Sequence, residues 1–234
     1  MRRRLLISVC AAAVVAGVMT PSQAAAQQSI NFYLGGFVPH DLGDRGADDV
    51  LLNNGSTLLF DFRDFRGVTA GGEYLVGLGD FFDGGLGIGI YSRTAFAVDR
   101  DFVQPDGSEI EADLKLRIVP ITATVRYLPL GHHDAIVPYI GGGVGIYNWR
   151  YTETGDFVTA NGDITHGAFA GTGTTVGPVI LGGVRVPIGR RGSGIGGEVR
   201  YQRGRGDLPS DQGFAGGKID LGGFNYLFTV NVGF

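Results

Sequence analysis

The sequence predicts an all-β fold, an eight-stranded antiparallel up-and-down transmembrane β-barrel. Eight segments alternate apolar side chains with small or polar ones at every second residue, which is the pattern of a strand with two unlike faces. The connections between these segments alternate long and short, as in barrels with tight turns at one end and extended loops at the other. No segment after residue 26 has the 3.6-residue apolar stripe of an amphipathic helix.

The first 26 residues have the pattern of a cleaved signal peptide. Met1 is followed by three arginines, an uncharged apolar run over residues 5–19 and the small residues Ala24, Ala25 and Ala26. The apolar run is shorter than the roughly 18 residues that a transmembrane helix needs. We therefore expect export and a single barrel domain over residues 27–234. That domain has no thiol, because Cys10 is the only cysteine of the chain.

Composition narrows the possible function classes. The formal charge of the whole chain is −4, and loss of residues 1–26 removes three arginines and no acid, which leaves −7. An acidic domain argues against a nucleic-acid partner, which calls for a basic patch. The 42 glycines follow no collagen-like period and are mixed with many aromatic residues. This mixture is typical of strands that pack closely inside a narrow barrel.

The eight strands are expected in order along residues 27–234. We expect them at residues 29–38, 67–78, 85–98, 112–127, 137–150, 174–187, 195–203 and 218–234, with residues 58–65 extending the second strand outward. Their apolar faces are carried by Phe32, Leu34 and Val38, by Val68, Tyr74 and Val76, by Leu86, Ile88 and Ile90, by Ile140, Val144 and Ile146, by Val176, Ile180 and Val184, and by Val199 and Tyr201. Residues 40–66, 99–111, 151–173 and 204–217 are then the long external loops, and the shorter links are periplasmic turns.

The fourth strand changes phase in its middle. Leu114, Leu116 and Ile118 share one parity, whereas Ile121 and Val125 share the other. A bulge at Val119-Pro120 would keep both sets on the outer face, and bulges tolerate proline because the ladder is already broken there. We therefore expect a bulge at this point.

The closing strand has one aromatic face. Phe228 and Phe234 belong to a set of apolar residues at every second position, opposite a small and polar set. A strand that ends in phenylalanine resembles the last strand of bacterial outer-membrane β-barrels. The resemblance implies that Phe228 and Phe234 form an assembly signal for the barrel assembly machinery, and that this strand pairs with the first.

The faces opposite the apolar ones carry charges. The expected inward-facing polar core consists of Glu73, Arg93, Lys115, Arg117, Arg185, Glu198 and Arg200. A charge that faced lipid near the bilayer midplane would cost roughly 2–4 kcal/mol. In an eight-stranded barrel the interior is just wide enough for side chains to fill it or to hold one small ligand. We expect these charges to pair with one another, and a conducting lumen is the alternative.

Residues 116–122 (LRIVPIT), the glycine-rich residues 138–145 and the terminal Phe234 resemble the small eight-stranded outer-membrane barrels of the OmpW and OmpA-like group. The resemblance implies location in the cell outer membrane, among its lipids and lipopolysaccharide. For the OmpW branch it also implies passage of small hydrophobic solutes through an apolar upper interior. The candidate lining would be Leu75, Tyr91, Tyr147, Trp149, Val179 and Leu181. Alternatively, Tyr147 and Trp149 belong to an interfacial aromatic belt, which we favour.

Catalytic and metal sites are not expected. His132 and His133 are adjacent on a short turn without a third ligand nearby, so a solvated turn is favoured over a metal site. His166 lies three residues after Asp163, but the sequence shows no recognisable set of serine, histidine and acid for nucleophilic catalysis. The acidic residues 41–49 lack the ligand spacing of a calcium loop, and a solvated face is favoured. We expect neither cofactor nor enzyme activity.

Three functional hypotheses follow from these observations. The favoured one is an integral outer-membrane barrel with a structural or surface-interaction role. The second is passage of small hydrophobic solutes across the outer membrane. The third is a soluble, lipocalin-like barrel, which would require apolar residues inside and charges outside.

Overall fold

The computed structural model describes residues 28–159, 161–188 and 193–234, and within them the chain is mostly β-structure. The expected signal peptide, residues 1–26, lies outside the described residues and stays a prediction. No helix in the described part of the chain is both long and apolar enough to cross a membrane.

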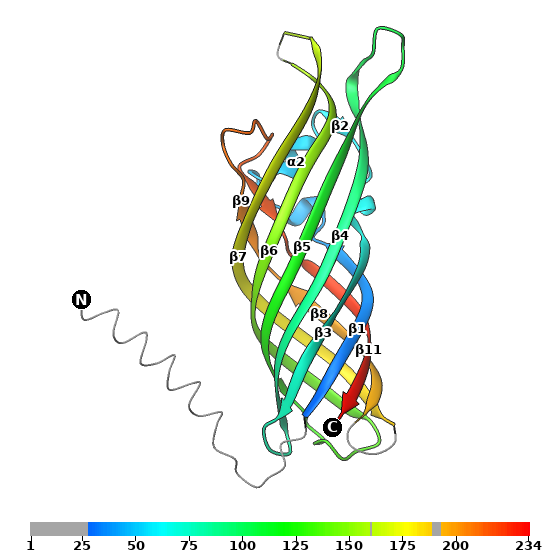
Figure 1. Cartoon of the computed structure of the whole chain (residues 1–234), viewed down its shortest axis with the longest axis vertical. Coiled ribbons are helices and arrows are strands. Elements are labelled where there is room, and N and C mark those ends of the chain that lie inside the picture. The colour runs from blue at the N-terminus through cyan, green and yellow to red at the C-terminus, as the bar shows by residue number, and fades with distance from the viewer. Residues whose placement is uncertain (1–27, 160, 189–192) are drawn as a thin grey trace, which may run out of the picture.

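Eight of the described strands pair into one closed antiparallel barrel (Figure 1). They are β1 (Gln28–Pro39), β3 (Gly67–Gly77), β4 (Phe82–Val103), β5 (Glu109–Tyr127), β6 (Val137–Val158), β7 (Ile164–Pro187), β8 (Gly194–Gln202) and β11 (Gly223–Gly233). Each pairs with the next of these strands along the chain, and β11 pairs with β1. The predicted eight-stranded up-and-down barrel is confirmed, as is its closure between the first and last strands.

The wall formed by β4 to β7 is much taller than the wall formed by β1, β3, β8 and β11 (Figure 1). β6 has 22 residues and β7 has 24, whereas β1 has 12. At about 3.3 Å per residue, β6 is about 70 Å long. The expected loops at residues 99–111 and 151–173 are therefore corrected, because most of both ranges continues the strands. Their polar composition belongs to strand extensions and not to coil.

Two connections between the short strands pack against the inner side of the tall wall. The first, residues 40–66, contains η1 (Leu42–Asp44), α2 (Val50–Asn54), β2 (Leu58–Leu59) and η2 (Phe62–Phe65). The second, residues 203–222, contains the hairpin of β9 (Arg205–Asp207) and β10 (Lys218–Asp220). We call these two segments together the plug. A parallel bridge between Asp49 and Lys218 joins them.

Aspartates begin the short helices of the plug. Asp41, Asp49 and Asp61 each accept a hydrogen bond from a backbone N–H at a helix N-terminus. Asp48 accepts one from the Gly217 N–H at 3.0 Å, which holds the two plug segments together. Asp49 itself is only 3% exposed. The acidic residues 41–49 therefore serve mainly in capping and in plug assembly, and the expected solvated face is wrong for Asp49.

Apolar side chains cover the outside of the lower barrel. Exposed large hydrophobic residues occur at alternate positions of all eight barrel strands, among them Phe32, Leu34, Leu86, Ile88, Ile121, Ile140, Val176, Val199 and Phe228. We call this surface the apolar belt. Its register is continuous, because Ile121 of β5 lies opposite Ile88 of β4 and Ile146 of β6. The predicted sidedness is confirmed for these residues, and the first half of β5 is the exception.

The expected bulge in the fourth strand is wrong. β5 pairs with β6 in unbroken register from Ala112 to Tyr127, straight through Pro120. Leu114, Leu116 and Ile118 therefore point into the barrel and are at most 1% exposed. The change of phase in the sequence marks the height at which the interior changes from polar to apolar, not a kink in the strand.

Candidate functional site

A layer of four buried charges crosses the lower part of the barrel interior. It contains Glu73 of β3, Arg126 of β5, and Glu198 and Arg200 of β8, each between 1% and 4% exposed. Arg126 Nη2 lies 2.9 Å from Glu198 Oε2 and also bonds to Glu73. Arg200 Nη2 lies 2.7 Å from Glu198 Oε1 and 3.3 Å from Glu73 Oε2. Two acids and two arginines thus form a neutral four-membered network, which we call the charged layer.

Neighbouring polar and aromatic groups complete the charged layer. The Thr124 hydroxyl donates to Glu73 Oε1 at 2.8 Å, and the Tyr139 hydroxyl donates to Glu198 Oε2 at 3.1 Å. The guanidinium of Arg126 also lies 4.8 Å from the centre of the Tyr139 ring. Buried charges are tolerated only when they are paired and hydrogen-bonded. Every charge of this network is paired, and Arg126 Nε is its one fully buried nitrogen without a hydrogen-bond partner among the described residues.

Glycine makes room for the charged layer. A Cβ at Gly85 would lie 2.5 Å from Glu73 Oε1 and 2.7 Å from Thr124 Oγ1. A larger residue at this position would therefore displace the Glu73 carboxylate. The space beside Gly85 is filled by neighbouring side chains, so this inward glycine does not mark open space in the lumen.

An apolar cluster fills the barrel above the charged layer. The wall contributes Tyr91, Leu116, Ile118, Tyr147, Trp149, Tyr151 and Val179, and the plug contributes Val50, Leu51, Leu58, Phe65, Leu208, Ile219 and Leu221. Tyr147 and Trp149 are 0% and 2% exposed. The plug thus provides the hydrophobic core for the inner face of the tall wall.

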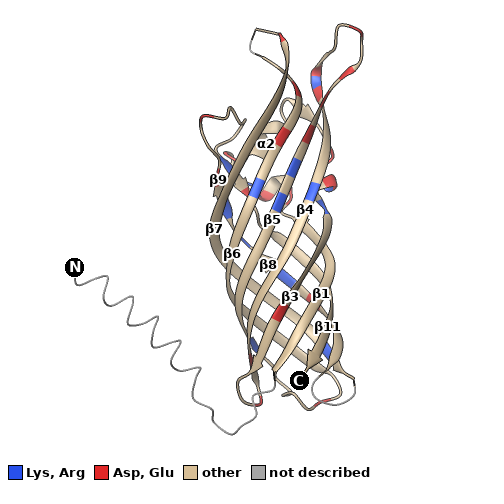
Figure 2. Cartoon of the chain, in the orientation of Figure 1, with Lys and Arg blue, Asp and Glu red and all other residues tan. Residues whose placement is uncertain are grey.

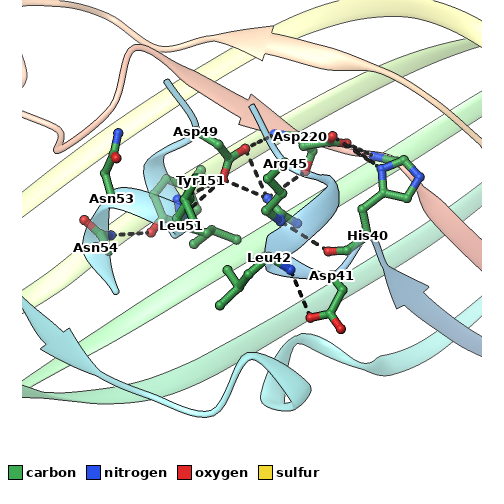
Figure 3. Close-up of polar contacts among 12 residues, drawn as sticks. His40, Asp41, Leu42, Arg45, Asp49, Leu51, Asn53, Asn54, Tyr151 and Asp220 are labelled. Carbon is green, nitrogen blue, oxygen red and sulfur yellow. Dashed lines mark hydrogen bonds and ion pairs between the residues drawn. The ribbon is translucent and has the colours of Figure 1, made fainter. Parts of the chain in front are cut away.

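Ionic contacts hold the plug together (Figure 3). Arg45 Nη1 lies 2.9 Å from Asp49 Oδ1, and both side chains are buried. Asp49 Oδ2 accepts a hydrogen bond of 2.6 Å from the backbone N–H of Asp220, which belongs to the second plug segment. His40 Nδ1 lies 3.3 Å from the Asp220 carboxylate. One buried carboxylate, that of Asp49, therefore connects α2, Arg45 and β10.

A second polar contact joins the plug to the tall wall. Asn54 Nδ2 donates to the Tyr151 hydroxyl at 3.2 Å (Figure 3). It also donates to Glu153 Oε1 at 2.6 Å. The Tyr151 hydroxyl donates to the same Glu153 oxygen at 2.9 Å. Burial raises the pKa of Glu153, and the hydrogen bonds that Glu153 accepts from Asn54 and Tyr151 act in the opposite direction. Glu153 thus anchors the end of α2 to β6.

The turn end of the barrel has its own ionic contact. His132 Nε2 lies 2.6 Å from Asp83 Oδ1, and Arg185 Nη1 lies 3.8 Å from Asp83 Oδ2. The hydrogen bond with Asp83 raises the pKa of His132. His133, the adjacent residue, is exposed. The expectation of a solvated turn is therefore wrong for His132.

The structure brings together only part of the predicted polar core. Glu73, Glu198 and Arg200 are in the charged layer, and Arg185 lies at the turn end beside Asp83. Arg93 is exposed, and its Nε donates to the carbonyl oxygen of Asp64 in the plug at 2.8 Å.

Two members of the predicted core, Lys115 and Arg117, are on the outer face instead. The reason is the missing bulge, since the inward positions of this part of β5 are taken by leucine and isoleucine. Sequence reasoning also missed Arg126, although it stands between the outward residues Val125 and Tyr127. That alternation was the available signal.

The predicted hydrophobic lining does not form one site. Tyr91, Tyr147, Trp149 and Val179 lie in the apolar cluster above the charged layer. Leu181 lies in a separate small cluster with Leu128, Val137 and Tyr139, and Leu75 is 1% exposed and belongs to neither cluster. The favoured interfacial belt for Tyr147 and Trp149 is wrong, because both side chains point inward.

Chemistry-bearing residues elsewhere are scattered. His166 Nδ1 lies 2.9 Å from Asp156 Oδ1 on the exposed extension of β6 and β7. Within residues 28–159, 161–188 and 193–234, no three His, Cys, Asp or Glu side chains are grouped as metal ligands.

Comparisons with known proteins found solved structures of similar fold. No protein-family model matches the chain, and no curated protein matches its sequence. The chain is similar to the N-terminal β-barrel domain of Pseudomonas aeruginosa OprF, with 12% identity, coverage of 89% of this chain and 99% of that one, and a TM-score of 0.40. It is also similar to Neisserial surface protein A (12%, 89% and 97%, TM-score 0.47) and to the outer membrane protein AlkL (15%, 92% and 95%, TM-score 0.34).

The fold is an eight-stranded antiparallel β-barrel, as the strand pairing of this chain itself shows. At this level of similarity the likeness concerns the fold alone. The unequal walls and the plug are described from this chain's own strand pairing and burial.

Proposed function

We propose that this protein is an integral outer-membrane barrel with a closed lumen and a structural or surface-interaction role. The observation that carries the proposal is the sidedness of the wall. Large apolar side chains are exposed around the lower barrel, whereas the four charges of the charged layer are at most 4% exposed. A soluble, lipocalin-like barrel would need the opposite arrangement, with its apolar residues inside.

The apolar belt fits a hydrocarbon environment. A membrane-spanning strand needs about 9–11 residues, and even β8, the shortest strand of the barrel, has 9. An exposed apolar surface that runs around the whole barrel would be an aggregation hazard in water, because soluble monomers rarely expose large contiguous apolar patches. In lipid the same surface is favourable.

Two obstructions support a closed lumen. The charged layer crosses the lower interior, and the plug with its apolar cluster fills the upper interior. Passage of small hydrophobic solutes, the second hypothesis, would require the plug to leave the barrel. Four of the residues that would line such a path are already in the same apolar cluster as Leu51 and Phe65 of the plug: Tyr91, Tyr147, Trp149 and Val179.

The orientation follows from the unequal ends of the barrel. Short connections join β3 to β4 and β5 to β6 at one end, and the tall wall and plug form the other. Outer-membrane barrels have short periplasmic turns and longer external segments. We therefore assign the tall wall to the outside of the cell, where it offers a surface for interaction.

Export and assembly belong to the same proposal. Residues 1–26 would be cleaved as a signal peptide, and the last strand would be read by the barrel assembly machinery. β11 carries Phe228 on its outer face, and Phe234 follows it with its backbone N–H bonded to the Gln28 carbonyl at 3.1 Å. An aromatic outer face on the closing strand supports this role.

Purified protein reconstituted in planar bilayers tests the closed lumen. We expect no conductance steps and no uptake of hydrophobic solutes into liposomes. Barrel insertion is checked in the same samples by protease protection of the strands. Regular conductance steps, or uptake above that of protein-free liposomes, would contradict the closed lumen.

A further inference from the structure

The outer wall carries three cations directly above the apolar belt. Lys115 and Arg117 of β5 and Arg150 of β6 all point outward and are exposed. Arg117 and Arg150 are directly opposite each other in the register of the two strands, and Lys115 lies opposite Thr152. Figure 2 shows blue segments on the upper half of β5 and on β6. We call these three residues the basic cluster.

The register gives the height of the basic cluster relative to the belt. Ile88, Ile121 and Ile146 form one cross-strand row of the belt. The row containing Arg117 lies four residues before Ile121 in β5, on the side away from the turn end. This row also includes Ser92, Arg150 and Thr172. At about 3.3 Å per residue, the two rows are about 13 Å apart along the strand. The basic cluster therefore lies just beyond the belt, and in the proposed orientation this places it at the headgroups of the outer leaflet.

No counter-charge within the described residues neutralises the basic cluster. None of its three members forms an ion pair or a side-chain hydrogen bond with another described residue. Arg117 and Arg150 are directly opposite each other on paired strands. Like charges in this arrangement repel each other and destabilise the pairing. The carboxylates of Asp113 and Glu111 follow on the same face of β5, farther from the belt.

The wall is hollowed at the basic cluster. One hollow of about 390 Å³ is bordered on the outer face by Arg117, Asn148, Arg150, Thr172 and Thr174. A second of about 230 Å³ is bordered by Lys115, Arg117, Arg150 and Thr152. Every one of these side chains carries a hydrogen-bond donor, and no carboxylate borders either hollow. Such a donor set suits an anion with several oxygens, because arginine binds phosphate through two parallel hydrogen bonds.

We propose that the basic cluster binds the phosphate groups of a phosphorylated glycolipid of the outer leaflet, the chemistry of lipopolysaccharide. The inference rests on the proposed function, since it needs the apolar belt in the bilayer with the tall wall outside. Arg117 and Arg150 would hold one phosphate between them, and Lys115 would add a third positive charge. The acyl chains would lie against the belt below.

Titration of the purified barrel with lipid A, followed by native mass spectrometry, tests the proposal. The R117Q/R150Q variant removes two cluster charges. The matched control R63Q/R66Q removes two exposed charges from residues 40–66, where neither side chain has an ion pair with a described residue. We expect R117Q/R150Q to bind lipid A at least about tenfold more weakly, because the loss of one charged hydrogen-bond pair is worth about that factor. The control should bind as the unchanged protein does.

Two further arms identify the source of the phosphate. Lipid A with its phosphates removed should bind the unchanged protein and R117Q/R150Q equally weakly. Phosphatidylglycerol should compete poorly, because its single phosphodiester offers fewer oxygens and less charge. Equal binding of lipid A by R117Q/R150Q and the control, or equal competition by phosphatidylglycerol, would overturn the assignment.

The design separates this inference from the proposed function. Membrane insertion of each variant is measured first, by protease protection in liposomes. R117K/R150K, which keeps the charge and loses the fork geometry, should insert normally and recover part of the affinity. Normal insertion without lipid A discrimination would overturn the lipid site alone, and failure of the unchanged protein to insert would overturn both.

Discussion

The side chains of Arg126 and Glu198 lie 2.9 Å apart, although β6 and β7 separate their strands, β5 and β8, in the barrel wall. Their contact therefore crosses the lumen. Together with Glu73 and Arg200 it makes a network with no net charge, so removal of any one member leaves an uncompensated buried charge.

This charge balance predicts a non-additive double-mutant cycle. Arg126→Met and Glu198→Gln should each lower the free energy of unfolding by about 3–5 kcal/mol, because each leaves a buried ion without its partner. The double variant keeps the neutral pair of Glu73 and Arg200, and it should lose less than the sum of the two single losses. Urea unfolding of the protein in lipid vesicles measures all three. Additive losses would show that the charged layer does not act as a unit.

The apolar belt predicts a position-dependent cost of charge on one strand. Val144 and Thr154 both lie on the outer face of β6. Val144 is within the belt, between the turn end and the basic cluster, and Thr154 is beyond the basic cluster. Val144→Arg should destabilise the inserted barrel by about 2–4 kcal/mol, and Thr154→Arg by about 1 kcal/mol or less. Unfolding titrations in bilayers give both values. Equal losses would mean that the belt does not face hydrocarbon.

The plug should open locally when Asp49 loses its charge. Asp49→Asn removes the partner of the buried Arg45 and weakens the cap on α2, so we expect faster hydrogen exchange over residues 42–54. Asp44→Asn, an exposed position in η1, is the matched control and should exchange at the original rate. Hydrogen-exchange mass spectrometry resolves this segment from the barrel strands. Unchanged exchange in Asp49→Asn would contradict the role assigned to its carboxylate.

The turn at residues 128–136 should be stabilised at acidic pH. The hydrogen bond with Asp83 raises the pKa of His132 in the folded protein. A raised pKa means that the stabilisation is fully present below the unfolded value, near 6.5, and is lost as the pH rises through the folded pKa. NMR titration of His132 and hydrogen exchange of this turn should both follow that transition.

The neighbouring histidine provides the control for this pH effect. His132→Gln should remove the pH dependence of the turn, whereas His133→Gln, at an exposed position, should preserve it. A dependence that survives in His132→Gln would assign the effect to another group.

The sequence predicted the barrel well because its period of two is imposed by packing on the inner side and, under the proposed function, by lipid on the outer side. Phe32, Leu86 and Ile140 are outward as expected, and Glu73 and Glu198 are inward. In β5 the apolar residues switch from even positions before Pro120 to odd positions after it, and this switch suggested a bulge. The strand in fact keeps its register, and the even positions before Pro120 are apolar because they face the apolar interior, where Leu116 packs in one cluster with plug residues.

The plug itself was not predictable from local patterns. Residues 40–66 are rich in polar residues and contain only short helices, so they read as an external loop. Several of their apolar members, such as Leu51 and Phe65, are buried by contacts with strands far away in the sequence. Long-range contacts of this kind leave no periodic signal, and the same is true of the hydrogen bond from the Asp220 N–H to Asp49.

Single cysteines along β11 test the central claim most directly, because Cys10 is the only natural cysteine. Phe228 and Val230 point outward, whereas Leu227 and Thr229 point inward. In liposomes, cysteines at the outward pair should react only with a membrane-soluble thiol reagent, and cysteines at the inward pair with neither that reagent nor a water-soluble one. Labelling of the inward pair by the water-soluble reagent would show an open aqueous lumen, and labelling of the outward pair by it would show that the barrel does not span the membrane.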